Sequence, residues 1–151
     1  MIILTLDAQE CAGIVQANRM ANLACALEGR PYVVPIYYAF DDNSLFSFSL
    51  PGRKIEWMRA NPRVCLQVGE RSQQGWKSVV IDGRFEELPE RTGHKREREH
   101  ARQLLSAHTD WWEPGSVRPV TPLRTGRSTY IFYRVIVEEM SGREAVEERP
   151  A

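Results

Sequence analysis

The sequence predicts a mainly β fold: a small six-stranded antiparallel β-barrel with short flanking helices. Short runs of alternating apolar and polar residues recur along the chain, and most are joined by turns too short to hold a crossover helix. Strands linked by hairpins cannot form a doubly wound parallel sheet. Closure into a barrel removes exposed sheet edges, and 151 residues suffice for one such domain.

The first elements follow from capping and turn residues. Asp7 and Glu10 form a capping box of the Asp type, which predicts a helix over residues 8–17. Alternating patterns interrupted by turns rich in Gly, Pro, Asp and Asn then predict three strands, over residues 20–27, 32–40 and 45–50.

A short helix over residues 53–60 is predicted next, and Asn61-Pro62 ends it because a residue before proline avoids helical backbone angles. Two strands follow around a polar loop at residues 70–75, and Gly83 in the second predicts a bulge or a close backbone approach. Their predicted ranges are 64–68 and 76–88.

The last third is predicted to hold a charged helix and one final strand. The helix covers residues 89–107, a proline-rich connection covers 111–127, and the strand covers 130–140. Ser141-Gly142-Arg143 is expected to end that strand. We therefore expect a single domain over residues 1–143 with a loose acidic tail over 144–151.

Composition excludes several classes of function. Lys plus Arg and Asp plus Glu each number 20, so no general attraction to nucleic acid or to an anionic membrane is expected. The chain shows neither an apolar run of membrane-spanning length nor a secretory signal, and its three scattered cysteines suggest a reduced, cytoplasmic protein. The three histidines lack the spacing of a metal site, so no metal is expected.

The segment from Ser49 to Lys54 has the components of a phosphate site. A strand ends in the Ser49 hydroxyl, a Pro-Gly break follows, and Arg53 and Lys54 open a helix. Cations at a helix N-terminus are electrostatically unfavourable unless an anion is present. Backbone N–H groups, a hydroxyl and two cations together favour a phosphate.

Pro35 interrupts a strongly strand-like run beside this segment. It is compatible with a plain edge strand, or with a broken ladder whose backbone groups at Val34, Ile36 and Tyr37 bind a flat heteroaromatic ring. A phosphate next to a flat apolar slot favours a nucleotide-like cofactor, of which flavin mononucleotide (FMN) is the simplest. No side chain is assigned a catalytic role.

At this point the motifs resemble a known family. Gly-Arg-Pro-Tyr-Val-Val-Pro at 29–35, Gly-Arg-Lys-Ile-Glu at 52–56, Asn-Pro-Arg-Val-Cys at 61–65, then Trp76, Ser78 and Gly83 are similar to the pyridoxamine 5'-phosphate oxidase-like proteins with an FMN-binding split barrel. The resemblance is greatest to the flavin-nucleotide-binding branch that includes nitroimidazole-resistance reductases. It covers residues 23–88 and, more loosely, 130–143.

The resemblance implies a homodimer with two FMN sites at its interface. It places the phosphate on Ser49, Arg53 and Lys54, and the isoalloxazine ring along the strand from Val34 to Tyr37. Trp76 and Ser78 would reach the flavin bound mainly by the partner subunit.

Phe48 departs from the nitroimidazole branch, whose members often carry histidine at this strand position. It is placed either in the packing of the core or beside the flavin in the substrate pocket. Two roles are considered for the loop aromatics Trp111 and Trp112: covering the barrel mouth, or forming a wall of the substrate pocket.

The function implied is an FMN-dependent oxidoreductase that passes electrons from a reduced nicotinamide to a small-molecule acceptor. The alternatives are a non-catalytic flavin carrier or sensor, a deazaflavin protein, and a haem-binding member of the same fold.

Overall fold

The structure, a computed structural model, describes residues 1–90, 93–107 and 130–148; within these ranges it has eight strands and three helices. The strands are β1 (Ile2–Leu6), β2 (Met20–Leu27), β3 (Arg30–Tyr37), β4 (Ala39–Asp41), β5 (Ser44–Ser49), β6 (Arg63–Ser72), β7 (Gly75–Glu87) and β8 (Ile131–Val146). The helices are α1 (Ala8–Ala17), α2 (Arg53–Ala60) and α3 (Lys95–Ser106).

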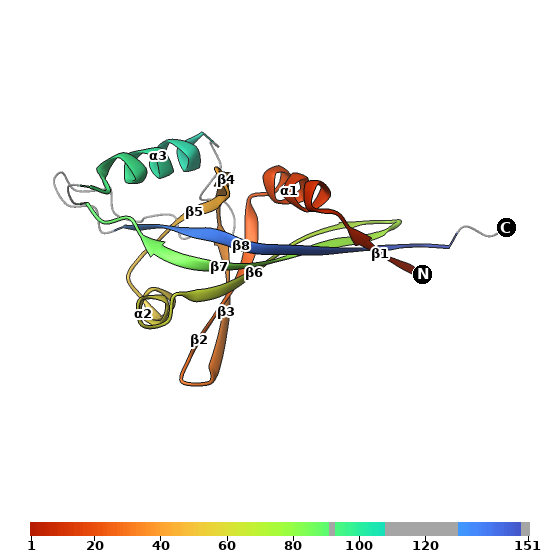
Figure 1. Ribbon diagram of the computed structural model, residues 1–151, viewed down its shortest axis with the longest axis horizontal. Coiled ribbons are helices and arrows are strands. Elements are labelled where there is room, and N and C mark those ends of the chain that lie inside the picture. The colour runs from red at the N-terminus through yellow and green to blue at the C-terminus, as the bar shows by residue number, and fades with distance from the viewer. Residues whose placement is uncertain (91–92, 108–129, 149–151) are drawn as a thin grey trace.

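The eight strands form one antiparallel sheet; seven of them follow the order β3-β2-β6-β7-β8-β5-β4, and β1 pairs with β8 off this path. The long strand β8 pairs with β7 along most of its length, with β5 through its first half and with β1 through its last residues. Figure 1 shows α1 and α3 on one side of β7 and β8, and α2 with the β2–β3 hairpin on the other. The mainly β, antiparallel prediction is confirmed, although the sheet is not closed.

The two predicted hairpins are present. Glu28 and Gly29 have φ angles of 52° and 76°, and Asp42 and Asn43 have φ angles of 47° and 57°. Two successive residues with positive φ form the turn type that matches the twist of paired strands. The β2–β3 hairpin therefore brings the Pro35 strand to one end of the sheet.

Asp7 caps α1 as predicted, because its carboxylate accepts a hydrogen bond of 2.8 Å from the backbone N–H of Glu10. The strand predicted over residues 32–40 is divided into β3 and β4 at Tyr38. The Tyr38 hydroxyl donates to the carbonyl of Val15 at 2.7 Å, and its backbone N–H donates to the carbonyl of Arg19. These bonds anchor the corner between β3 and β4 to α1 and to the start of β2.

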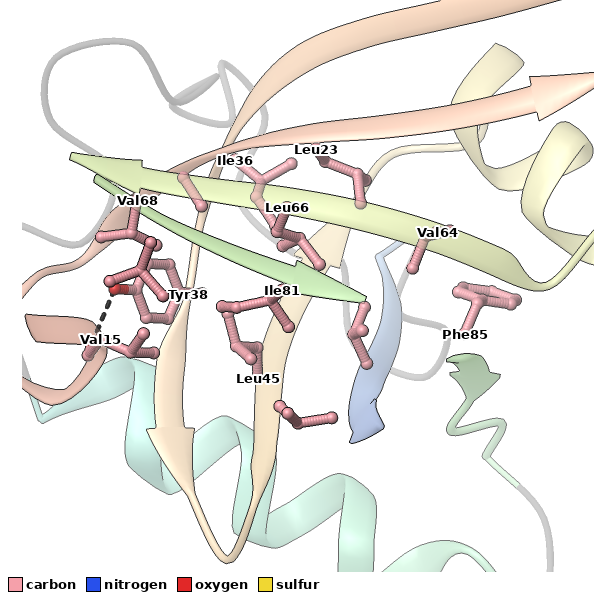
Figure 2. Close-up of a cluster of buried hydrophobic side chains, with 14 of the residues drawn as sticks. Val15, Leu23, Ile36, Tyr38, Leu45, Val64, Leu66, Val68, Ile81 and Phe85 are labelled. Atoms are coloured by element: carbon pink, nitrogen blue, oxygen red, sulfur yellow. Dashed lines mark hydrogen bonds between the residues drawn. The ribbon is translucent and has the colours of Figure 1, made fainter. Parts of the chain in front are cut away.

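The core has two parts. The main cluster is formed by buried side chains of β2, β3, β5, β6, β7 and β8 and of the inner faces of α1 and α2. Figure 2 shows part of it, including Leu23, Leu66, Ile81 and the Tyr38–Val15 bond. A smaller group, which we call the α3 cluster, joins α3 to the ends of the strands. It contains Ala39, Phe46, Leu88, Ala101, Leu105, Tyr130 and Phe132.

Gly83 has the predicted role. The register between β7 and β8 shifts between Asp82 and Gly83, so that Asp82 faces Glu139 while Gly83 faces Val137. A Cβ on Gly83 would lie 2.6 Å from the carbonyl oxygen of Ile136. Glycine therefore permits the bulge and the close approach of the two backbones.

Gly142 does not end the last strand, as the sequence suggested, but lies inside β8. A Cβ there would be 2.7 Å from the Cys11 sulfur, so this glycine makes room for α1 to pack on the strand. Residues Glu144 to Val146, expected in a loose tail, pair with β7 and with β1. β1 itself was not predicted, because its pairing surface is supplied by the far end of the chain.

Other boundaries also differ from the predictions. The predicted loop at residues 70–75 is reduced to a tight hairpin, since β6 extends to Ser72 and β7 begins at Gly75. Helix α3 begins only at Lys95. The proline-rich connection and Trp111-Trp112 lie outside the described residues. None of the described helices is long and apolar enough to cross a membrane.

Candidate functional site

A cavity of about 310 Å³, which we call the edge cavity, lies where the edge strand β3, the end of β5 and the start of α2 meet. The sequence brings these elements together because β5 leads through Leu50-Pro51-Gly52 directly into α2. Eight of the ten predicted cofactor residues contribute to its wall. The lining is Tyr32, Val34, Pro35, Ile36, Tyr37, Phe48, Ser49, Leu50, Pro51, Gly52, Arg53, Lys54 and Tyr130.

One end of the edge cavity carries the groups that the sequence predicts to bind a phosphate. Gly52 caps α2 without a side-chain hydrogen bond, so the first N–H groups of the helix have no side-chain cap. Among the described residues, neither Arg53 nor Lys54 forms an ion pair, although both stand in the first helical turn. Two uncompensated cations at a helix N-terminus fit an anion.

Lys54 is the more enclosed of the two cations. Burial lowers the pKa of its amine, while the nearby Cys25 thiol acts in the opposite direction. Burial likewise raises the pKa of Cys25, and Lys54 opposes that rise. A bound phosphate would place a negative charge beside this half-buried amine and so favour its protonated form.

Ser49 is buried at this end, and its hydroxyl donates to the carbonyl of Leu50 at 2.7 Å. The hydroxyl can still accept a hydrogen bond, and it must rotate away from Leu50 to donate to a phosphate.

The long wall of the edge cavity is the outer edge of β3. In the described part of the chain β3 pairs only with β2, and Pro35 faces Asn22 in that ladder. The edge-strand interpretation of Pro35 is therefore correct, and the unpaired edge also faces the cavity. The Ser47 hydroxyl donates to the carbonyl of Tyr37 and so ties β5 to β3 across the site.

An aromatic wall closes the other side. Phe48 contacts Tyr130 edge-on, with ring centroids 5.4 Å apart, and lies 6.3 Å from Phe132. Phe48 packs against the α3 cluster and also lines the edge cavity, so both roles considered for it have a structural basis. Alternation along β5 holds as predicted, with Phe46 in the α3 cluster, Phe48 packed against that cluster and Ser47 bonded to β3.

Two aromatic lining residues, Tyr32 and Tyr130, were missed as site residues. Tyr130 comes from the segment before β8, about 80 residues after the phosphate turn, and no local pattern connects the two. Arg98 of α3 holds it in place: one guanidinium nitrogen donates to the Tyr130 carbonyl at 3.4 Å and another to the Leu88 carbonyl at 3.2 Å. Tyr32 lies two residues before Val34, and residues at this spacing share one face of a strand. This alternation is a signal that could have identified Tyr32.

Trp76 and Ser78 do not reach the edge cavity of their own chain. They line a separate hollow of about 680 Å³ on β2, β6 and β7, which shares only Pro35 with the edge cavity. Ser78 accepts a hydrogen bond of 2.9 Å from Gln67, and Trp76 is 36% exposed. We call this second hollow the outer hollow.

The chemistry of the edge cavity is that of binding. Its described lining contains backbone edges, aromatic rings, hydroxyls and two cations, but no carboxylate and no imidazole. It can hold a flat ring against β3 and an anion at α2. The described lining offers no carboxylate or imidazole as a general base and no histidine as a haem ligand.

Comparison with known proteins agrees with this geometry. A family model described as pyridoxamine 5'-phosphate oxidase matches residues 7–144. An uncharacterised protein of Rhizobium meliloti (strain 1021) is 47% identical over 146 residues, which cover 96% of this chain and 97% of that protein.

Solved structures share the fold. An FAD-binding protein from Mesorhizobium loti is 55% identical, covers 96% of this chain and 99% of its own, and has a TM-score of 0.80. A protein from Bacteroides thetaiotaomicron assigned to 5-nitroimidazole antibiotic resistance has a TM-score of 0.72 at 22% identity, with 95% of this chain and 87% of that chain covered. At that identity the second likeness shows the split-barrel fold alone.

Proposed function

Because the chain belongs to the pyridoxamine 5'-phosphate oxidase family, we propose that it binds a phosphorylated flavin, with at least the FMN moiety, in the edge cavity. The observation that carries this proposal is the pair Arg53 and Lys54, two cations without an acidic partner in the described chain, at the uncapped start of α2. The 55% identical relative that is an FAD-binding protein supports a flavin as the ligand.

The residues fit the two halves of that group. Lys54, Arg53, Ser49 and the first N–H groups of α2 would hold the phosphate. The β3 edge from Val34 to Tyr37 would hold the ring through backbone groups, with Phe48 and Tyr130 on its other side. A bound flavin supplies two-electron redox chemistry, and the protein supplies binding, orientation and exclusion of water.

We further propose that the protein is an oxidoreductase that passes electrons from a reduced nicotinamide to a small-molecule acceptor. Transfer between two stacked rings needs no protein acid or base, which agrees with the lining of the edge cavity. Steady-state oxidation of NADH or NADPH with a panel of acceptors tests it. Flavin binding without turnover for any acceptor would instead assign a carrier or sensor role.

Phosphate recognition is tested by titrating the flavin-free protein with FMN and riboflavin. One charge-assisted contact contributes roughly 1.5–3 kcal/mol, so riboflavin should bind about ten to a hundred times more weakly. Lys54→Met should weaken FMN binding and leave riboflavin unchanged. Lys95→Met, which removes a charge from α3 instead, is the matched control. Equal affinities for FMN and riboflavin in the wild-type protein would overturn the assignment.

We also propose a homodimer in which the outer hollow of one chain adjoins the flavin of its partner. Trp76 and Ser78 lie outside the edge cavity of their own chain, and β2, β3 and β7 expose Met20, Val33 and Val80 by 40%, 63% and 38%, respectively. Such apolar exposure is typical of an interaction surface. Light scattering tests this, and a stable monomer with flavin bound at micromolar concentration would contradict it.

A further inference from the structure

We propose that the edge cavity recognises the imide N–H of the flavin ring through the backbone carbonyl of Pro35. Ser47, which does not line the cavity, is the positioning residue that holds this edge of β3 in place. This assignment rests on the proposed function, because it takes the flavin ring to lie along β3.

The backbone groups of β3 point in two alternating directions. The N–H of Tyr38 donates to the carbonyl of Arg19 at 2.8 Å, in register with the β2–β3 ladder. Hydrogen-bonded and non-hydrogen-bonded positions alternate in an antiparallel pair. Counting back from Tyr37, every second residue of β3 therefore directs its N–H and carbonyl away from β2. These outward residues are Tyr37, Pro35, Val33 and Pro31.

Val34 and Ile36 occupy the alternate positions, so their backbone groups face β2. Both residues line the edge cavity, and what they offer a ligand is an apolar side chain. The placement of proline follows the same alternation. Pro31 and Pro35 both stand at outward positions, where a missing N–H leaves no bond of the β2–β3 ladder unmade.

Pro35 presents an acceptor to the edge cavity. Of the four outward residues, Pro35 and Tyr37 line the cavity. The Tyr37 carbonyl already accepts a hydrogen bond from the Ser47 hydroxyl. Pro35 has no N–H, so its backbone offers a ligand a carbonyl only. In the described part of the sheet β3 has no second neighbour, so no ladder occupies that carbonyl.

An acceptor at this place selects one edge of the flavin ring. The oxidised ring carries a single N–H, the imide N–H between its two carbonyls. A carbonyl that a ligand covers without a hydrogen bond costs free energy, so the ring is favoured with its donor toward Pro35. We therefore expect the imide edge of the ring to face β3.

Ser47 fixes the position of this edge relative to β5. Its side chain is buried, with 1% exposed, and its hydroxyl bonds the Tyr37 carbonyl, two residues from Pro35. β3 and β5 are not neighbours in the sheet, so no ladder sets their separation. The next two residues of β5, Phe48 and Ser49, line the opposite side of the cavity. Ser47 thus sets the gap between the two sides without contacting the ligand.

A second hydroxyl lies behind Ser47. Tyr133 faces Ser47 in the β5–β8 ladder and is fully buried, with its ring 5.4 Å from that of Phe85. Burial raises the pKa of Tyr133, and the Ser47 hydroxyl opposes that rise. Because Ser47 gives its only proton to the Tyr37 carbonyl, it offers lone pairs on the side of Tyr133. Tyr133 therefore supports the orientation of Ser47 that points toward β3.

Ring analogues test the role of the imide edge in the flavin-free wild-type protein. The analogue 3-methylriboflavin lacks the imide N–H and should bind roughly five to a hundred and fifty times more weakly than riboflavin, because the Pro35 carbonyl loses its partner. The control is 5-deazariboflavin, which alters the central ring, keeps the imide N–H and should bind like riboflavin. Equal affinities for riboflavin and 3-methylriboflavin would overturn the assignment to Pro35.

Ser47→Ala tests the positioning role. It should weaken FMN and riboflavin by the same factor, about two- to ten-fold, since one hydrogen bond is lost and the phosphate end is unchanged. It should also reduce the penalty for 3-methylriboflavin and shift the visible absorption bands of the bound flavin, which lower stability alone would not do. Ser44→Ala is the matched control, because it removes another buried hydroxyl of β5 that lies outside the edge cavity.

Tyr133→Phe is a second variant, which keeps the ring in the core and removes only the hydroxyl behind Ser47. It should shift the absorption bands in the same direction, by less. Unchanged bands in both Ser47→Ala and Tyr133→Phe, or equal shifts in Ser44→Ala, would overturn the positioning role and leave the flavin site intact. Failure of FMN and riboflavin alike to bind the wild-type protein would refute the proposed function itself.

Discussion

Replacing Gly142 by alanine should destabilise the fold through one identifiable collision. The added Cβ would lie 2.7 Å from the Cys11 sulfur and 3.0 Å from Cδ1 of Leu6. Both neighbours are buried, with exposed fractions of 1% and 6%, so neither can move into solvent. Overpacking of this kind costs about 1–3 kcal/mol, and we expect Gly142→Ala to lower the free energy of unfolding by that amount.

A double-mutant cycle isolates the cause. Cys11→Ala removes the sulfur, and in that background Gly142→Ala should cost clearly less, with a coupling energy of about 1–2 kcal/mol in urea denaturation. Gly13→Ala is the control. Gly13 is exposed on α1, the helix that carries Cys11, and no atom lies within 4 Å of the Cβ that would be added. It should stabilise by about 0.5–1 kcal/mol. Additive effects of the two substitutions would refute the collision as the reason for this glycine.

Three further predictions concern the site and its support. Phe48→Leu should lower the free energy of unfolding by about 1 kcal/mol and also change relative rates with different acceptors, and an unchanged acceptor preference would limit Phe48 to packing. FMN affinity should fall as pH rises through the lowered pKa of Lys54, because only the protonated amine attracts phosphate, and titrations at several pH values should show no such fall in Lys54→Met. Burial raises the pKa of Tyr133 to about 12. Since an unfolded tyrosine ionises near pH 10, stability should be retained below about pH 10 and be lost toward pH 12, and Tyr133→Phe should reduce that loss in urea denaturation.

Local rules were sufficient for those parts of the fold that depend on neighbouring residues. The α1 cap, the turns at Glu28-Gly29 and Asp42-Asn43, and the helix after Pro51-Gly52 each follow from a few consecutive side chains. Ser49, Arg53 and Lys54 were expected in one place for the same reason, since they belong to one continuous segment, and all three line the edge cavity. The bulge at Gly83 could be predicted because few other reasons place glycine inside a long strand.

Features that depend on distant segments were not predictable in this way. Gly142 has the local signature of a strand end, but its function is to admit Cys11 from a helix more than 120 residues earlier. Glu144 to Val146 look like a polar tail, yet their backbone groups are paired by β1 and β7. Tyr130 lines the edge cavity from a segment whose carbonyl accepts a hydrogen bond from Arg98 of α3, far from the phosphate turn in sequence.

The two halves of the candidate site place different demands on the fold. The proposed anion end uses residues of one short segment, so it requires only the local turn from β5 into α2. The proposed ring end requires a sheet edge that stays unpaired within the described chain, and an exposed edge normally invites association with other strands. Pro35 lacks a backbone donor, and the Ser47 hydroxyl already binds the nearby carbonyl of Tyr37. This edge is therefore poorly suited to pair with another strand. Its other backbone groups can bind a ligand. The same two residues, Pro35 and Ser47, thus protect the edge from pairing with another strand and leave it available as a binding wall.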